Sequence, residues 1–294
     1  MSGSVAAGYP NFLGLSDDEA DFGTARAVIL PVPYDGTSTW HKGADHGPAA
    51  LLQASTQVEL FDIETQSEPW REGIATLPPI EDAASPEEMA ARVEREVHKI
   101  CTAGKMPVVI GGEHSVSLGA INAVAASCGG DLTVLQIDAH GDTRESYHGS
   151  THNHACVMAR AREVATITQV GIRAIAAEEY ASMDLARVFF AHDIVGSSGR
   201  GWIDDVLSTL ASKVYITIDL DAFDPSLLPA TGTPEPGGLN WQDVIQLVKA
   251  VTNSRELVGF DVVELLPSPG QHASEFIAAK LVHRILAMHF AATV

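Results

Sequence analysis

The sequence predicts an α/β fold that forms one domain around a mainly parallel sheet. Apolar, strand-like runs alternate with helical patterns along the chain, and these runs are continuously apolar rather than alternating. Parallel strands that helices cover on both faces produce runs of this kind. The chain has 294 residues, enough for one large domain, and no long linker or repeat divides it. We therefore expect a single domain over residues 1–294.

The expected strands are short and follow one another along the whole chain. They cover residues 25–33, 106–110, 132–138, 165–172, 187–194, 213–221 and 256–265. Helical patterns lie between several of them, including residues 202–212 and 241–253, and residues 274–290 predict a packed terminal helix.

One helix has clear start and stop signals. Ser85 and Glu88 have the spacing of a capping box, and Pro86 suits the first helical position. Gly104 is expected to end this helix. Its apolar side chains recur at helical spacing and should face the core: Met89, Val93, Val97 and Ile100.

Composition and charge limit the class of ligand. Thirty-eight acidic residues against eighteen basic ones give a formal charge of −20, which disfavours nucleic acid and anionic membranes as partners. No apolar stretch is long enough to span a membrane, and the N-terminus lacks the pattern of a secretory signal. Three widely spaced cysteines fit a reducing compartment better than a disulfide framework. We expect a cytoplasmic protein.

Unusual polar residues follow three of the predicted strands. His114 lies in GGEHS, Asp138, His140 and Asp142 lie in DAHGD, and the motif DLDAFDP holds two more acids, Asp219 and Asp221. Ligands of such sheets bind beyond the carboxyl ends of the strands. Residues two apart on an extended backbone point to the same side, so the members of each cluster can converge on one site.

These clusters predict a site for two divalent cations. Burying unpaired carboxylates is strongly unfavourable, and two divalent ions would balance the charge of four carboxylates. Oxygen ligands with two imidazoles and no thiolate favour Mn²⁺ or a similar hard ion. A lone Asp-x-Asp or a lone histidine is more often structural, as a turn or a helix cap. Three clusters at three strand ends favour a metal site.

The motifs together resemble the ureohydrolase family of arginases and agmatinases. GGEHS, DAHGDTR, DLDAFDPSLLPATGTPEPGGL and DVVELLP occur in the family's order and spacing, and VPYDGTSTWHKGADHGPAAL is similar to its first loop. The likeness covers most of the chain, and residues 1–24 form an N-terminal extension without family motifs. The resemblance implies a three-layer α/β fold with a parallel, eight-stranded central sheet.

The resemblance also implies the ligands of two manganese ions. One ion would be bound by His114, Asp138, Asp142 and Asp219, and the other by His140, Asp138, Asp219 and Asp221. Asp138 and Asp219 would bridge the ions, and a hydroxide shared between the ions would attack the guanidinium carbon.

Three residues receive catalytic roles from the same resemblance. Asp142 would orient the hydroxide and help to pass its proton to the leaving amine. Glu264, in VELLP, would anchor the planar guanidinium bidentately. His154 matches the family's proton-shuttling histidine, although Ala155 follows it where glycine is usual, and His152 is the alternative. The tripeptide His152–His154 also fits an HNH nuclease, which the acidic composition argues against.

The expected substrate is a small cationic guanidino compound. The recognition pattern that arginases use for the α-amino and α-carboxylate groups is not visible after the aspartate cluster. We therefore expect agmatine, cleaved to putrescine and urea in polyamine biosynthesis, with guanidinobutyrate or another guanidino acid next and arginine after that. Arg144 could face a substrate carboxylate, but pairing with a nearby acid is the favoured role.

Two other classes of protein are alternatives to a ureohydrolase. Metal-dependent deacetylases have the same fold but bind one zinc, and His114 and Asp142 argue against that class. An inactive, metal-binding oligomeric paralogue is the non-enzyme alternative, since fold does not imply activity. The family resemblance implies a homotrimer or a homohexamer.

Overall fold

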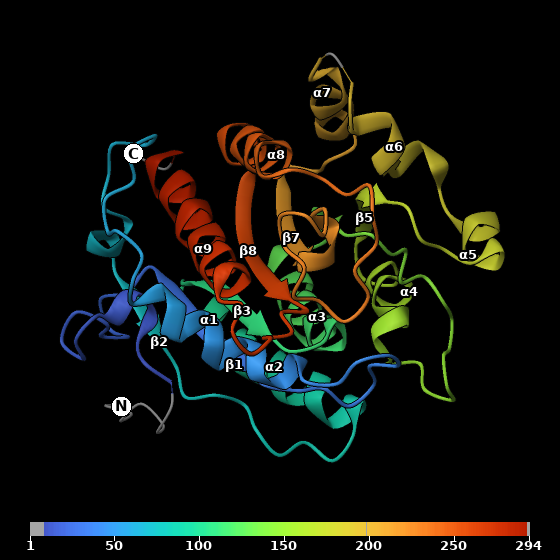
Figure 1. The fold of residues 1–294 in the computed structure, drawn as a ribbon. Helices are drawn as coiled ribbons and strands as arrows, with labels where there is room; N and C mark the ends of the chain where they lie inside the picture. Colours follow the sequence, from blue (N-terminus) through green and yellow to red (C-terminus); the bar gives the residue numbers. More distant parts are fainter. Residues whose placement is uncertain (1–8, 198, 293–294) are drawn as a thin grey trace.

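All eight strands of the central sheet run parallel, in the order β2-β1-β3-β8-β7-β4-β5-β6 (Figure 1). The structure is a computed structural model that describes residues 9–197 and 199–292. The strands are β1 (Ala27–Val32), β2 (Ile74–Thr76), β3 (Met106–Gly111), β4 (Leu132–Ile137), β5 (Thr166–Ile172), β6 (Val188–Phe190), β7 (Lys213–Asp219) and β8 (Glu256–Val263). The predicted parallel, eight-stranded α/β fold is confirmed.

Helices cover both faces of this sheet and complete three layers (Figure 1). They are α1 (Gly47–Ser55), α2 (Pro86–Thr102), α3 (Ser117–Cys128), α4 (Val157–Ala161), α5 (Ala177–Ser182), α6 (Ala191–Ile194), α7 (Gly201–Ser208), α8 (Trp241–Ser254) and α9 (Ala273–Ala292). One core joins α1, α7, α8 and α9 to the sheet face that contains Ile29. The other joins α2, α3 and α4 to the face that contains Val28. The predicted terminal helix is α9.

The central strands are buried on both faces, as their sequences predicted. Every residue of β1, β3 and β4 is buried. Strands β3, β8, β7 and β4 are consecutive neighbours in the sheet, so their carboxyl ends lie side by side at one edge. That edge is where the functional site is expected.

Helix α2 begins and ends where its sequence predicted. The Ser85 hydroxyl accepts a hydrogen bond from the Glu88 N–H at 3.2 Å. The Glu88 carboxylate in turn accepts from the Ala84 N–H rather than from that of Ser85. Gly104 follows the helix with a φ of +71°, which glycine adopts without a steric cost. All four predicted core residues of this helix are buried.

Two parts of the sheet differ from the sequence prediction. Strand β2 was not predicted; it has three residues at the sheet edge, too few to show a period. The strand predicted over residues 187–194 is wrong beyond Phe190, because Ala191–Ile194 forms the short helix α6.

Part of the predicted N-terminal extension packs onto the domain. Phe12 is fully buried in the core with α1, and the Leu13 N–H donates to the Ser55 hydroxyl at 2.9 Å. Residues 1–8 of that extension lie outside the described residues.

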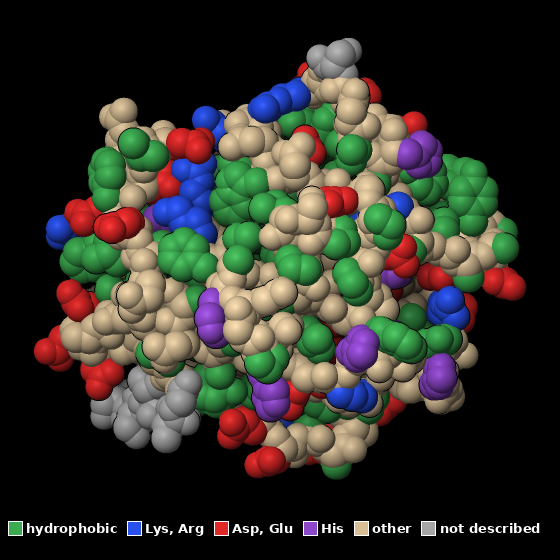
Figure 2. All heavy atoms as spheres, viewed as in Figure 1, with side chains coloured by type: hydrophobic (Ala, Val, Ile, Leu, Met, Phe, Trp, Pro, Cys, Tyr) green, Lys and Arg blue, Asp and Glu red, His purple; other side chains and the backbone are tan. Residues whose placement is uncertain are grey.

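The surface carries the acidic charge that the composition predicted. In the space-filling view, acidic side chains are spread around the visible face (Figure 2). No helix within residues 9–197 and 199–292 is long and apolar enough to cross a membrane. All three cysteines are unpaired, and Cys156 is buried.

Candidate metal centre

The ends of four neighbouring strands bring the predicted site residues together. His114 follows β3 in the short 3-10 helix His114–Val116, which precedes α3, and Asp138 comes directly after β4. Asp219 is the last residue of β7, with Asp221 two residues beyond, and Glu264 comes directly after β8. The sheet order alone therefore places these five side chains at one edge.

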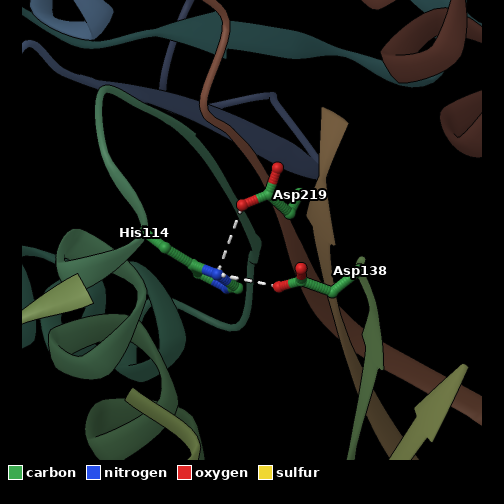
Figure 3. A group of neighbouring side chains, drawn as sticks. All are labelled: His114, Asp138 and Asp219. Carbon is green, nitrogen blue, oxygen red and sulfur yellow. Dashed lines mark ion pairs between the residues drawn. The ribbon is translucent and has the colours of Figure 1, made fainter. Parts of the chain in front are cut away.

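The first group of possible metal ligands is His114, Asp138 and Asp219. Nδ1 of His114 lies 3.2 Å from Oδ2 of Asp138 and 3.6 Å from Oδ2 of Asp219, and Figure 3 shows the three side chains directed toward one another. Oδ2 of Asp142 lies 3.0 Å from the same nitrogen. All four residues are buried, as a closed ligand set requires.

The second group is Asp138, His140 and Asp221. Nδ1 of His140 lies 2.9 Å from Oδ2 of Asp221 and 3.8 Å from Oδ1 of Asp138. Asp138 therefore offers one carboxylate oxygen to each group. A shared carboxylate of this kind can bridge two ions.

The aspartate cluster converges on the site for a different reason than strand alternation. Strand β4 ends at Ile137, so Asp138 to Asp142 lie in the loop that follows this strand. Asp142 has a φ of +51°, a left-handed conformation that non-glycine residues seldom adopt. Its carbonyl accepts the N–H of Met158 at 2.9 Å, which fixes this turn against α4. The prediction that these side chains converge is correct. The predicted cause, alternation along an extended strand, is wrong, because a loop and a left-handed turn bring them together.

Burial and mutual repulsion perturb the acids of the site. Burial, then the charges of Asp221 and Asp142, raise the pKa of Asp138 to about 7. Burial, Asp221 and Asp138 raise the pKa of Asp219 well above its usual range. Burial alone would lower the pKa of His140, but the Asp221 and Asp138 carboxylates outweigh it and raise this pKa to about 10. The negative charge of this buried cluster must therefore be offset by bound protons when no cations are bound.

The residues fit a pair of divalent cations. Nδ1 of His114 is buried and makes no hydrogen bond within the described part of the chain, although it faces carboxylate oxygens. An unpartnered buried nitrogen is costly, and a metal ion would satisfy it. The donor set is rich in carboxylates and holds no thiolate, which suits a hard ion.

A second layer of hydrogen bonds fixes the His114 ring. The Thr217 hydroxyl donates to Oδ1 of Asp261 at 2.6 Å and lies 2.9 Å from Nε2 of His114. Since its one proton is used on Asp261, Thr217 must accept from Nε2–H of His114. Nδ1 then keeps its lone pair and faces the carboxylates. Tyr215 donates to the other oxygen of Asp261 at 2.8 Å.

A similar chain holds Asp138. Nε2 of Gln136 donates to Oδ2 of Asp138 at 2.7 Å, and Nε2 of Gln169 donates to the side-chain oxygen Oε1 of Gln136 at 2.5 Å. Sequence reasoning missed Gln136 and Thr217. Each precedes an aspartate ligand by two residues and so lies on the same side of its strand, which is the signal that could have identified it.

An open cavity of about 360 Å³ lies over the ligand groups. Its wall includes His114, His140, Asp142, Asp219, Asp221 and Glu264, and beyond them Trp40, His41, Arg144, Tyr147, His154, Glu179 and Glu235. Arg144 forms an ion pair with Glu179 at 3.3 Å and lies over the Tyr147 ring. The prediction that Arg144 pairs with a nearby acid is confirmed.

The structure separates the neighbouring histidines. His154 lines the cavity, and its Nδ1 lies 3.1 Å from the Thr37 hydroxyl. His152 is not among the lining residues; its Nδ1 lies 3.0 Å from the Thr151 hydroxyl and 3.9 Å from Glu87. His148 stacks edge-on against Tyr147.

Glu264 lies between the cavity and the His114 loop. Its Oε1 accepts the His114 N–H at 2.8 Å, and its own N–H donates to the Gly112 carbonyl at 2.7 Å. Burial, then the charge of Glu113, raise its pKa well above the usual range. A positive φ of +65° turns the backbone at this residue.

Two carboxylate–histidine groups lie at one edge of the parallel sheet and share one aspartate. This arrangement is that of a binuclear metalloenzyme site. Comparison with known proteins gives the family. The arginase family model matches residues 25–288, nearly the whole chain. The chain belongs to this family, the arginases and ureohydrolases, and the predicted resemblance is confirmed.

Individual relatives agree with this assignment. The chain is 37% identical to the N(1)-aminopropylagmatine ureohydrolase of Synechocystis, covering 92% of this chain and 91% of that protein. It is 32% identical to the agmatinase of Pyrococcus horikoshii, covering 91% and 93%. The crystal structure of agmatine ureohydrolase of Thermoplasma volcanium superposes with a TM-score of 0.86 at 32% identity, covering 94% of each chain.

Proposed function

We propose that this protein uses two Mn²⁺ ions to hydrolyse the guanidino group of an agmatine-type cation to urea and an amine. The observation that carries the proposal is the pair of ligand groups sharing Asp138 below a cavity that also holds Glu264. A cavity with two such groups and an acid for a cation has the parts that guanidinium hydrolysis needs.

The proposed ligand sets extend the two observed groups. We assign His114, Asp138, Asp142 and Asp219 to one ion and His140, Asp138, Asp219 and Asp221 to the other. Support comes from the convergence of both histidines on carboxylates and from the carboxylate-rich donor set. Two ions bound there would supply a nucleophile from water at neutral pH and would stabilise developing negative charge.

Glu264 is proposed to bind the guanidinium of the substrate. The His114 N–H occupies Oε1 and orients the carboxylate. Because burial raises its pKa, Glu264 favours a cationic partner that restores its charge. The planar guanidinium offers parallel N–H donors to such a carboxylate.

Two residues are proposed to move protons. Asp142, beside His114, accepts a proton from the attacking water as the planar carbon becomes tetrahedral. His154, rather than His152, carries a proton to the leaving amine, since only His154 of the two lines the cavity. Proton transfer of this kind contributes about 10²- to 10⁴-fold to rate.

The cavity favours a polycationic substrate over a guanidino acid. Among the described residues that line it, Arg144 is the one lysine or arginine, and Glu179 already pairs with it. A substrate carboxylate would therefore meet no unpaired arginine or lysine, whereas Glu235 lines the wall as a further acid.

N(1)-aminopropylagmatine is the first candidate substrate, because the Synechocystis relative, which has the higher identity of the two relatives compared above, is named for that compound. Agmatine, the substrate expected from the sequence, is the second, because an agmatinase is also closely similar. Hydrolysis would release urea and a triamine from the first, and urea and putrescine from the second.

Urea release from four substrates tests this proposal. We expect kcat/KM to be highest for N(1)-aminopropylagmatine, then agmatine, with guanidinobutyrate and arginine at least about 100-fold lower, since a carboxylate would lack a charged partner. A preference for arginine would contradict the assignment. No urea from any of them would favour an inactive, metal-binding paralogue. The cytoplasmic location and the trimeric or hexameric assembly stay predictions.

A further inference from the structure

Thr37, in the loop after β1, connects the buried carboxylate of Glu113 with the half-buried imidazole of His154, which come from distant parts of the chain. Its hydroxyl lies 2.8 Å from both carboxylate oxygens of Glu113, the residue before His114. The same oxygen lies 3.1 Å from Nδ1 of His154 and accepts the His154 backbone N–H at 3.0 Å. Carboxylate, hydroxyl and imidazole therefore form one continuous chain of hydrogen bonds at the cavity wall.

Counting donors settles the direction of this chain. Glu113 is fully buried and receives the Thr37 N–H at 2.8 Å, the Ser115 hydroxyl at 2.5 Å and the Ser38 hydroxyl at 3.3 Å. Surrounded by donors, this carboxylate also accepts the single proton of the Thr37 hydroxyl. The Thr37 oxygen can then only accept from the His154 ring, so Nδ1 of His154 carries the proton.

The other ring nitrogen of His154 is available for proton transfer. Nε2 of His154 has no hydrogen-bond partner among the described residues, while the ring itself lines the cavity. Nδ1–H held by Thr37 leaves Nε2 with a lone pair, the form that a proton carrier requires. Thr37 and Glu113 both lie within the motifs that resemble the family, but neither receives a role from that resemblance.

We propose that Thr37, backed by Glu113, is a positioning residue that fixes the ring orientation and the tautomer of His154. The inference rests on the proposed function, since it assigns a partner to the proposed proton carrier. Thr37 acts through His154 and touches no reacting atom. Removing its hydroxyl lets the imidazole adopt the other tautomer or turn away, and part of the gain from proton transfer is lost.

The test needs a substitution that removes the Thr37 hydroxyl and changes little else. Thr37→Val removes the hydroxyl but keeps the branched shape and the backbone N–H that Glu113 accepts. The loop keeps other anchors, including the Gly43 N–H donating to Asp35 at 2.7 Å. Thr37→Ser retains the hydroxyl. Thr166→Val, at the exposed first residue of β5, is the matched control.

Steady-state kinetics of the Mn²⁺-loaded variants test the proposal. We expect Thr37→Val to lower kcat about 30- to 300-fold with KM within about 3-fold and metal content unchanged, because positioning acts on proton transfer and not on binding. Thr37→Ser should recover kcat to within about 5-fold, and Thr166→Val should match the wild type. A Thr37→Val enzyme with wild-type kcat would overturn the proposal.

A double variant separates positioning from a general structural role. In a His154→Asn background, adding Thr37→Val should lower kcat by less than about 3-fold, because the hydroxyl has no imidazole left to hold. A full additional loss there would show that Thr37 acts independently of His154 and would refute the inference.

One readout does not depend on turnover. In the protein loaded with diamagnetic Mg²⁺, the ¹⁵N shifts of the His154 ring should show a protonated Nδ1 and an unprotonated Nε2. The reverse pattern would overturn the inference even if the enzyme is active. Absence of urea from every substrate, with the expected ring pattern, would defeat the proposed function alone.

Discussion

Glu264→Gln tests how the substrate guanidinium is held. In the structure, Oε1 of Glu264 is occupied by the His114 N–H, and a glutamine oxygen can accept the same bond. The glutamine NH₂ would then face the guanidinium, placing donors against donors. The charge-assisted hydrogen bond at Oε2, worth about 3 kcal/mol, is lost, and the one at Oε1 loses about 1 kcal/mol of charge assistance, or about 4 kcal/mol in total, which corresponds to about 10³-fold in kcat/KM.

Urea release and metal analysis together are the assay for this variant. Glu264 belongs to neither ligand group, so the metal content should equal that of the wild type. Glu178→Gln, an exposed glutamate of α5, is the control and should keep full activity. A Glu264→Gln enzyme within about 10-fold of wild-type kcat/KM would refute the role given to this carboxylate.

Four further substitutions test the metal centre, the fold around it and a buried histidine. Asp138→Ala should lose both ions and all activity, whereas Asp142→Asn should keep most of the metal and lose turnover; two ions bound to the Asp138 variant would contradict its shared position. A Cβ at Gly112 would lie 2.1 Å from the Tyr34 carbonyl, so Gly112→Ala should cost at least about 3 kcal/mol of unfolding free energy, and an unchanged Tm would show that the loop yields instead. Burial, then the charge of Lys280, lower the pKa of His283 to about 4. That histidine stays neutral in the fold while its unfolded counterpart protonates near pH 6.5, so its contribution is complete at pH 7 and is lost as pH falls from about 6.5 to 4. His283→Gln should remove about 2 kcal/mol of the stability difference between pH 7 and pH 5 in urea unfolding, and an unchanged difference would contradict the shifted pKa.

The sheet and the ligand clusters could be predicted because their signals are local. Strands such as β3 and β4 are buried on both faces, so their sequences are continuously apolar. The polar residues that follow them stand out against that background. Once the strands are parallel, the residues after their carboxyl ends meet at one edge without any knowledge of side-chain geometry.

Features that depend on spatial partners could not be predicted. Strand β2 exists because it pairs with β1, and its three residues carry no period. The left-handed turn at Asp142 depends on α4, whose N–H groups its carbonyl accepts. Thr37 and Glu113 are 76 residues apart in sequence, and only the fold joins them to His154.

Titration of the metal-free protein with Mn²⁺, followed by urea release from N(1)-aminopropylagmatine and agmatine, tests the central claim most directly. The shared aspartate and the two ligand groups predict that activity rises to a plateau at two ions per chain and disappears again with a chelator. A plateau at one ion per chain, or no urea from either compound with both ions bound, would contradict a binuclear guanidino hydrolase.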